Sequence, residues 1–345
     1  MLLRGDDPLS IARAADHLAA GELVAFPTET LYGLGARADD DAAVARIFAA
    51  KGRPADHPLI VHVADAASAR AFAADWPALA ARMAQALWPG PLTLIVPRAA
   101  GLAGVAAGGQ DTIALRCPSH SLGHALLVAA AERGVPGVAA PSANRFGRIS
   151  PTTAAHVQAE FGDTLTVLDG GACSVGIESA IVDCTRGVPV LLRPGALTRE
   201  LLEAAAGEPL RERDDAAPRA SGTLASHYAT QARLRLMPAP ALRDALGLLA
   251  GTLPAQPGAA RLAVYSRTVR PPGGAGLAFR TMPATARAAA HELFAVLREL
   301  DALGVALIWV EQPPDDPEWD GVRDRLQRAA ADREATNAVT TMEIR

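Results

Sequence analysis

Over the first 208 residues, short apolar runs rich in branched side chains alternate with stretches of helical spacing. The short runs predict strands at residues 22–26, 59–63, 92–96, 112–115, 137–140, 165–168, 180–183 and 190–192. Apolar positions three or four residues apart predict helices at residues 10–20, 39–50, 66–74, 77–87 and 121–133. Ser150 and Pro151 suit the N-cap and first position of a further helix. The order has no steady strand–helix–strand rhythm, which predicts an α/β domain with a mixed sheet.

The pattern changes after residue 207. Residues 208–223 are charged, contain Pro209, Pro218 and Gly222, and show no apolar period, as is typical of a linker. Beyond them the pattern predicts strands at 234–237, 261–265 and 305–310 and helices at 285–303 and 320–331. We therefore expect a larger α/β domain at 1–207, a linker at 208–229, and a smaller Rossmann-like α/β domain at 230–345.

Composition narrows the class of protein. The three cysteines show no CxxC spacing, which favours reduced thiols in a cytoplasmic protein over disulfides or a zinc site. We find no signal-peptide pattern, and the apolar stretches are too short to span a bilayer, so no membrane partner is expected. Residues 1–208 carry 16 basic and 21 acidic side chains, a net charge of −5. This balance argues against a protein held on nucleic acid by its overall charge.

Lys51 is the only lysine among the 33 basic residues. A single leftover lysine can fall anywhere in a chain that otherwise uses arginine. Alternatively, position 51 needs a compact ammonium that a planar guanidinium cannot replace. Its neighbours Arg53 and Pro54 favour the second interpretation.

Common nucleotide and hydrolase fingerprints are missing from the chain. There is no GxxxxGK[ST], Gly33-Leu34-Gly35 does not continue as GxGxxG, and no GxSxG elbow is present. His120 and His124 share a predicted helix face, but without a further ligand at suitable spacing we expect an ordinary helical pair rather than a metal site.

Loops at the predicted strand ends carry small hydroxyls and cations instead. These loops are PTETLYGLG (27–35), KGRPADHPLIVH (51–62), WPGPLTLI (88–95), PSANRFGRISPT (141–152), GIESAIVD (176–183) and LRPG (192–195). Each alone has an ordinary role in turns or caps. Together they predict a pocket that can hold polyphosphate, because cations supply charge while hydroxyls and backbone N–H groups supply direction.

In this order, the six blocks closely resemble the YrdC-like family of threonylcarbamoyl-AMP synthases, over roughly residues 10–205. The segment Ser221-Gly222-Thr223-Leu224-Ala225-Ser226-His227-Tyr228-Ala229 and the extra C-terminal domain resemble the longer, two-domain form. The resemblance implies a twisted mixed sheet with a concave cavity. It also implies condensation of L-threonine, bicarbonate and ATP into threonylcarbamoyl-AMP and pyrophosphate. The product would pass to the threonylcarbamoyl-transfer machinery, which forms threonylcarbamoyladenosine (t6A) beside the anticodon of tRNAs reading ANN codons.

By the same resemblance, site residues carry over where the motifs match. The residues expected around threonine are Thr30, His62, Arg116, Ala140 and Ser179. Those expected around ATP are Arg53, His57, Thr112, Ser142, Asn144, Ser150, Arg193 and Tyr228. Lys51 and Arg53 would form the catalytic phosphate clamp, with Mg²⁺ arriving on ATP and no dedicated metal cage.

Three departures from the family pattern and three alternatives remain. ESAIVD replaces the more usual ESTVVD, so Ala180 lacks the family's hydroxyl. His57 stands where the family has asparagine, and the linker motif lacks the usual proline, methionine and first tyrosine. A double-stranded RNA binder with weak RNA contact is one alternative; a carbamoyl-transfer enzyme of hydrogenase maturation is another. The acidic first domain disfavours the former, and the missing CxxC pairs disfavour the latter. The intact KGRP, PSAN and LRPG blocks disfavour the third alternative, a regulatory protein with a degenerate pocket.

Overall fold

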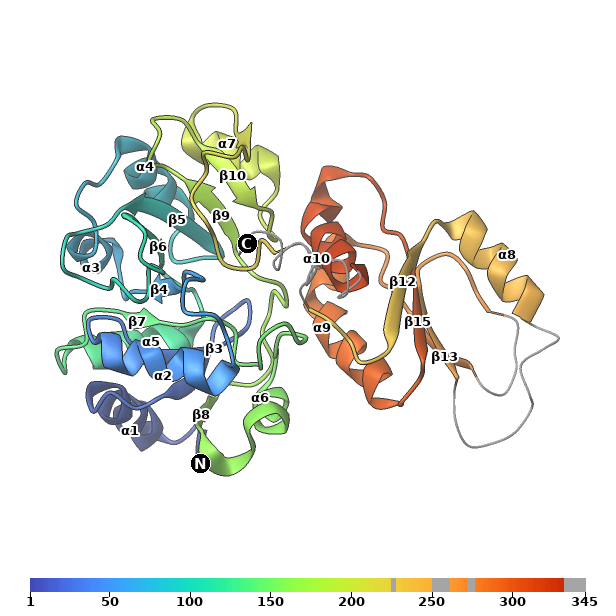
Figure 1. Ribbon diagram of the computed structural model, residues 1–345, viewed down its shortest axis with the longest axis horizontal. Coiled ribbons are helices and arrows are strands. Elements are labelled where there is room, and N and C mark those ends of the chain that lie inside the picture. The colour runs from blue at the N-terminus through green and yellow to red at the C-terminus, as the bar shows by residue number, and fades with distance from the viewer. Residues whose placement is uncertain (225–227, 250–260, 272–276, 332–345) are drawn as a thin grey trace, which may run out of the picture. The chain divides into compact units, whose positions relative to one another are not determined.

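The computed structural model describes residues 1–224, 228–249, 261–271 and 277–331 (Figure 1). Contacts divide the chain into two units. The N-terminal unit comprises residues 1–146 and 150–223, and the C-terminal unit comprises residues 147–149 and 224–345. Each unit has its own sheet, so the two are described separately.

An 11-stranded mixed sheet forms the centre of the N-terminal unit (Figure 1), in the order β1-β8-β2-β3-β7-β4-β6-β5-β9-β10-β11. The strands are β1 (Leu2–Arg4), β2 (Val24–Pro27), β3 (Tyr32–Arg37), β4 (Ile60–His62), β5 (Leu92–Pro97), β6 (Thr112–Arg116), β7 (Val138–Ala139), β8 (Thr166–Asp169), β9 (Ala180–Asp183), β10 (Val190–Arg193) and β11 (Arg211–Glu212). Parallel pairs such as β4–β6 and antiparallel pairs such as β2–β3 both occur. The expected mixed α/β fold is confirmed.

Helices pack around this sheet, and most of them begin at polar caps. They are α1 (Pro8–Ala19), α2 (Asp41–Lys51), α3 (Ala66–Ala71), α4 (Ala78–Leu87), α5 (Ser121–Ala131), α6 (Ala154–Phe161) and α7 (Arg199–Ala206), with the 3₁₀ turn η1 (Gly162–Thr164). Asp40 caps α2 by accepting from the N–H groups of Ala42 and Ala43, and Gly52 ends that helix at φ 64°. A left-handed residue at this position favours glycine, so the sequence Lys51-Gly52 fixes where the helix stops.

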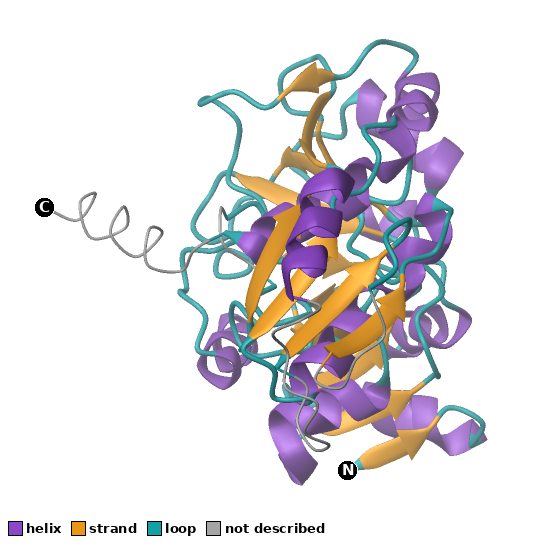
Figure 2. Cartoon of the chain, turned by 90° about the vertical axis from the view of Figure 1, so that its right-hand side faces the viewer, coloured by secondary structure: helices purple, strands orange, loops and turns teal. Residues whose placement is uncertain are grey.

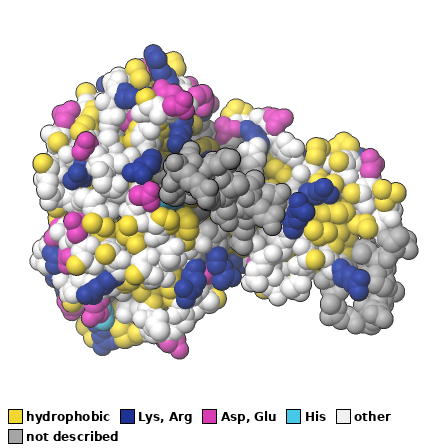
Figure 3. All heavy atoms as spheres, in the orientation of Figure 1, with side chains coloured by type: hydrophobic (Ala, Val, Ile, Leu, Met, Phe, Trp, Pro, Cys, Tyr) yellow, Lys and Arg dark blue, Asp and Glu magenta, His cyan; other side chains and the backbone are white. Residues whose placement is uncertain are grey.

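Aliphatic side chains fill most of the interior of the N-terminal unit. A large cluster includes Val44, Ile47, Val61 and Leu94, and a second cluster joins helices α1 and α5 through residues such as Leu18 and Leu126. Few aromatic residues contribute, as the low aromatic content predicts. The charged side chains outside are mixed, and Figure 3 shows basic and acidic groups interspersed over the visible face.

The C-terminal unit contains a four-stranded parallel sheet in the order β12-β15-β13-β14, whose strands are drawn in orange in Figure 2. Its elements are β12 (Arg233–Met237), α8 (Ala239–Leu249), β13 (Leu262–Ser266), β14 (Leu277–Thr281), α9 (Ala286–Ala302), β15 (Leu307–Glu311), η2 (Pro317–Trp319) and α10 (Asp320–Ala330). Thr285 caps α9, which buries residues such as Leu293, Phe294 and Leu297. The parallel sheet agrees with the expected Rossmann-like α/β domain.

Three expectations about local structure are wrong. Ser150-Pro151 does not begin a helix: α6 begins at Ala154 with Thr153 as its cap. The first helix is capped by Asp7, and Ser10 lies inside it. Helices α7 and α8 and the strands β1, β3, β11 and β14 were not expected. The sequence pattern does not predict β3 because the strand contains Gly33 and Gly35, and glycine has low strand propensity.

Tertiary packing explains those two glycines. A Cβ at Gly33 would lie 3.1 Å from Ala140 Cβ, and one at Gly35 would lie 2.7 Å from a methyl of Val138. Only glycine lets β7 and the segment that follows it approach β3 this closely. Of the helices described, none is long and apolar enough to cross a membrane.

Candidate active site

Arg116 and Glu29 form a buried ion pair at the end of strand β6. The Nη2 atom of Arg116 lies 2.8 Å from Glu29 Oε1, and both side chains are about 5% exposed or less. Arg116 Nη1 donates to Thr30 Oγ1 at 2.8 Å, and Thr30 shares a hydrogen bond with Thr28 Oγ1. Glu29 also accepts from the Ser119 backbone N–H. The result is a fixed cation with hydroxyls beside it, which suits a carboxylate and a hydroxyl of a ligand.

His62 lies next to Arg116 because the parallel strands β4 and β6 pair these two residues. Its ring makes an edge contact with Phe26 at 5.9 Å and is buried. Burial and then the charge of Arg116 lower the pKa of His62 to about 3. His62 is therefore neutral at pH 7. Its Nδ1 atom is buried and has no hydrogen-bond partner among the described residues.

Lys51 occupies the last position of α2 and is buried. Its Nζ atom donates to the carbonyl oxygens of Ser142, at 2.6 Å, and Asn144. The pKa of Lys51 lies well below its ordinary value, because the ammonium is desolvated and then because Arg53 is near. Lys51 thus fixes the loop that follows β7 through hydrogen bonds to two of its backbone carbonyls.

Arg53 and His57 contact Phe146 of the same loop. The Arg53 guanidinium carbon lies 5.7 Å from the Phe146 ring centroid, and the His57 ring meets Phe146 edge-on at 5.5 Å. Arg53 Nη2 also donates to the Pro58 carbonyl at 3.1 Å. Burial, and then the charge of Arg53, lower the pKa of His57. Arg53 and His57, the residue that stands where the family has asparagine, therefore lie next to each other.

A third cluster surrounds Ser179. Arg193 is buried and donates through Nη2 and Nε to the Ser179 carbonyl, at 2.9 and 3.1 Å, and through Nη2 to Ser179 Oγ at 3.2 Å. The Ser179 hydroxyl also bonds Thr93 Oγ1 at 2.7 Å. Next to it in sequence, Glu178 accepts from Ser150 Oγ at 2.9 Å. This explains why Ser150 is not a helix cap: its hydroxyl is used across the fold.

Backbone contacts join these clusters. Ser142 bridges to Gly33, the Tyr32 N–H donates to the Pro151 carbonyl, and the Val175 N–H donates to the Glu29 carbonyl. Segments far apart in the sequence therefore meet where the PTET strand end and the PSAN loop come together. The Ala140 N–H is used by the Ile60 carbonyl at 2.9 Å, so it is not available to a ligand.

Two predicted residues stand apart from these contacts. Thr112 shares a strand with Arg116 but lies at the other end of β6, half-buried. Tyr228 belongs to the C-terminal unit, where its buried ring lies 5.1 Å from Phe294. Residues 225–227, also expected in the linker, lie outside the described residues.

The sequence-based expectation omitted Glu29, Glu178, Thr28 and Thr93. All four belong to the six quoted blocks, so the signal was present in those motifs. Their importance comes from the partners they orient, Arg116, Ser150, Thr30 and Ser179. His120 acts as the cap of α5, and His124 bonds the Ala64 carbonyl. Among the described residues, no group of three or more His, Cys, Asp or Glu could hold a metal ion.

Comparison with known proteins places this arrangement in a family. A family model described as telomere recombination, for Sua5, YciO and YrdC, matches residues 16–195. A second model, the C-terminal domain of threonylcarbamoyl-AMP synthase, matches residues 197–331. The chain belongs to the threonylcarbamoyl-AMP synthase family. These enzymes are ATP-using nucleotidyltransferases that serve t6A modification of tRNA, and this chain has their two-domain form. The match of residues 197–331 to the synthase's own C-terminal domain disfavours the hydrogenase-maturation alternative.

Individual proteins similar to this chain support the same family assignment. A threonylcarbamoyl-AMP synthase of Pyrococcus abyssi is 47% identical over 196 residues, which cover 56% of this chain and 56% of that protein. One from Schizosaccharomyces pombe is 32% identical over 349 residues, covering 89% and 85% of the two chains. The crystal structure of P. abyssi Sua5 with L-threonine is 36% identical, with a TM-score of 0.83 and coverage of 96% and 97%. The shared architecture thus extends over both domains.

Proposed function

We propose that this chain condenses L-threonine, bicarbonate and ATP into threonylcarbamoyl-AMP and pyrophosphate. The observation that carries the proposal is the buried Arg116–Glu29–Thr30 cluster, paired through β4 and β6 with a neutral His62. The L-threonine complex of the related P. abyssi protein supports it. We further propose that the product passes to the threonylcarbamoyl-transfer machinery in the cytoplasm.

Threonine suits the Arg116 cluster. The guanidinium would bind the amino acid's carboxylate, since Arg–carboxylate pairs are among the strongest hydrogen bonds in proteins. Thr30 and the buried Nδ1 of His62 would then bind the threonine hydroxyl, with the Ser179 hydroxyl and the Ala140 wall on its other sides.

The reaction needs alignment more than acid–base chemistry. Bicarbonate takes up a proton and gives CO₂ and water. The neutral threonine amine attacks the carbon of CO₂ and loses a proton, which balances the proton taken up, and the product is a carbamate. A carbamate oxygen then attacks the α-phosphorus of ATP, and the bond to the leaving pyrophosphate breaks. Such transfers depend mainly on positioning and on charge stabilisation. The fixed cations and hydroxyls described above supply both.

ATP would lie along the PSAN side of the site. Arg53, Arg193 and the hydroxyls of Ser142 and Ser150 would contact phosphates, with His57, Thr112, Asn144 and Tyr228 as further contacts. Lys51 would act by holding the PSAN loop, since its ammonium is bonded to two carbonyls of that loop. Mg²⁺ would be held chiefly by phosphate oxygens and would neutralise their charge, because Glu29 and Glu178 are already engaged by Arg116 and Ser150.

Residues 208–229 would close over the nucleotide and keep water from the carbamate. A contact of Arg193, one of the residues proposed to bind ATP, supports this: its Nη1 donates to the Ser221 carbonyl at 2.7 Å. Arg219 Nη2 donates to the Gly108 carbonyl, and Gln110 accepts from the Arg219 N–H. In this proposal residues 1–207 form the catalytic domain, residues 208–229 the linker that acts as a lid, and residues 230–345 the smaller α/β domain.

The test is pyrophosphate release in CO₂-depleted buffer, with bicarbonate and amino acids added back separately. Release should require threonine and bicarbonate together, whereas an enzyme that adenylates threonine directly needs no bicarbonate. Valine should be rejected because it leaves the buried hydroxyl partners unpaired. Serine keeps the hydroxyl and should be a weaker substrate. Equal release without bicarbonate, or with valine, would contradict the proposed function.

A further inference from the structure

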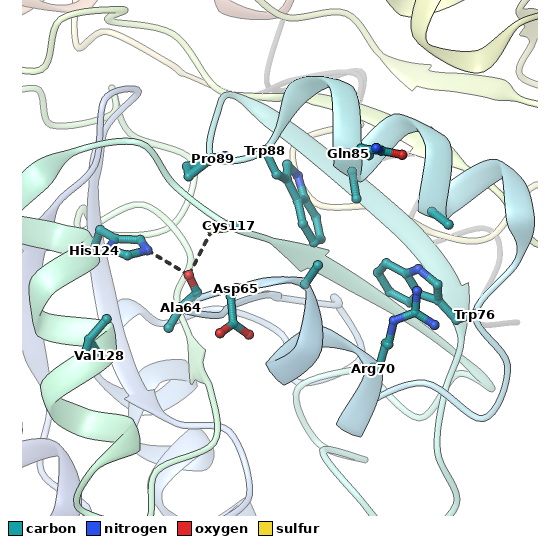
Figure 4. Close-up of a pocket in the computed structure, with 13 residues that line it drawn as sticks. Ala64, Asp65, Arg70, Trp76, Gln85, Trp88, Pro89, Cys117, His124 and Val128 are labelled. Atoms are coloured by element: carbon teal, nitrogen blue, oxygen red, sulfur yellow. Dashed lines mark hydrogen bonds between the residues drawn. The ribbon is translucent and has the colours of Figure 1, made fainter.

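A cavity of about 630 Å³ lies in the N-terminal unit, apart from the clusters described above (Figure 4). It is formed by residues at and before α3, by Trp76 and one face of α4, by the turn before β5, by the residue after β6, and by one face of α5. None of the ATP or threonine contacts proposed above lines it. Its size falls within the range of small-molecule sites in proteins. The proposed reaction leaves this cavity without a role.

Two indole rings form one wall. The ring centroids of Trp76 and Trp88 are 6.2 Å apart, with planes tilted by 52°. Trp88 is fixed because its Nε1 donates to the Leu92 carbonyl at 2.7 Å. The guanidinium carbon of Arg70 lies 5.4 Å from the Trp76 centroid, so the face of Trp76 already accommodates a cation. Arg70 is exposed, and it can leave that face without losing a buried contact.

The polar side chains across the cavity from the indole rings belong to Asp65, Cys117 and His124. Asp65 uses one carboxylate oxygen to cap α3, accepting from the Ser68 N–H at 2.7 Å. This bond is the main cause that lowers the pKa of Asp65, so the carboxylate is charged at pH 7. The exposed carboxylate lies in the lining of the cavity, where it can also accept a hydrogen bond from a ligand. His124 Nε2 and Cys117 Sγ both donate to the Ala64 carbonyl, which fixes these two side chains in the lining.

We propose that this cavity binds a small organic cation with a flat apolar body, of the arylalkyl amine class. The ammonium would lie near Asp65, and the aromatic body would pack on Trp76 and Trp88 among the alanines of α4, displacing Arg70. Figure 4 shows Asp65 with His124 on one side and the two indole rings on the other. Cation–π contact with tryptophan and a single charged acceptor are enough to select an amine over a neutral or anionic molecule of the same shape.

The cavity also touches the backbone that carries the proposed threonine contacts. Cys117 follows Arg116, and Ala64 lies two residues after His62. Gly90, next to the lining residue Pro89, accepts from Arg116 Nε at 3.4 Å and donates its N–H to the Cys117 carbonyl at 2.8 Å. An amine in the cavity would therefore alter the position of Arg116 and change the KM for threonine. This second step rests on the proposed function.

Binding is tested by calorimetry on the full chain with 2-phenylethylamine, 2-phenylethanol, phenylacetate and butylamine. 2-Phenylethylamine should bind, and the other three should bind more weakly by about tenfold or more. Asp65→Asn should weaken the amine by a similar factor while still capping α3, since asparagine is an equally good cap. Trp76→Leu should weaken it too. Asp40→Asn is the matched control, because Asp40 caps α2 in the same way away from the cavity.

Two outcomes would overturn the site: equal binding of the alcohol, or no effect of Asp65→Asn. Butylamine binding as tightly as 2-phenylethylamine would also overturn the aromatic class, and would point to a lysine side chain of a partner protein. The coupling is tested separately by pyrophosphate release with saturating amine. The threonine KM should change in the wild type and not in Asp65→Asn. An unchanged KM would overturn the coupling alone, whereas no turnover in the absence of amine would contradict the proposed function and not the site.

Discussion

The Nζ atom of Lys51 lies 2.6 Å from the carbonyl oxygen of Ser142, although 91 positions separate the two residues. A second carbonyl, that of Asn144, accepts from the same ammonium. The loop returns the contact, since the Phe146 N–H donates to the Lys51 carbonyl at 2.9 Å. The end of helix α2 and the PSAN loop are thus fixed to each other by the only lysine of the chain.

Replacing this lysine tests why an arginine-rich chain keeps it. Lys51→Arg should lower the rate of pyrophosphate release by about a hundredfold, because a guanidinium too large for the two carbonyls displaces the loop by about 1 Å. The fold should remain, as judged by thermal unfolding. Arg46→Lys, on the exposed face of the same helix, is the control and should leave both measurements unchanged. Near-normal turnover of Lys51→Arg would make the lone lysine a compositional accident.

Glu29 should be as important as the residues it orients. Glu29→Gln leaves the Arg116 charge buried without a counter-ion, which should lower the free energy of unfolding by about 3 kcal/mol. The KM for threonine should rise in the same variant, because Arg116 loses its fixed position. Denaturant unfolding and pyrophosphate release measure the two effects. Glu22→Gln removes an exposed partner of His17 and should cost less than about 1 kcal/mol. An unchanged threonine KM in Glu29→Gln would separate Arg116 from threonine binding.

His62 should make stability depend on pH. Its pKa is about 3 in the folded chain and about 6.5 when unfolded, so the unfolded state binds the extra proton between these values. Stability from this residue is complete above pH 6.5 and falls as the pH drops toward 3. The expected loss is about 2 kcal/mol between pH 7.5 and pH 5. His62→Gln should lose this part of the pH dependence in denaturant titrations. The same slope in variant and wild type would show that His62 is not held neutral.

The segment before the C-terminal unit should respond to substrates. Adding ATP and threonine should increase hydrogen-exchange protection over residues 208–224, because closure shields backbone N–H groups from water. Arg193→Lys should reduce that increase, since a lysine cannot bond Ser179 and Ser221 at the same time. Helix α1 serves as an internal reference. If exchange over residues 208–224 is the same with and without substrates, this segment is not a lid.

The sequence by itself determined the chemistry and many of the local elements. Helix α2 follows from its Asp40 cap and the left-handed Gly52, and α9 follows from the Thr285 cap and its apolar spacing. Both signals lie within a few residues of the element that they define. The ordered motifs also determined the family, because six blocks in sequence specify a set of strand-end loops even before their positions in space are known.

Tertiary structure alone decided which partners those loops acquire. Strand β3 contains glycines because β7 and the segment after it pack closely against them. Ser150 does not cap a helix because its hydroxyl donates to Glu178. Glu29 becomes a site residue only because the sheet order brings it to Arg116, 87 positions away in sequence. Hydrogen bonds and ion pairs depend on distance in space, and a local pattern of residues carries no information about such distances. The same reason explains the cavity beside Trp76 and Trp88, whose walls come from segments between residues 64 and 128 that no motif connects.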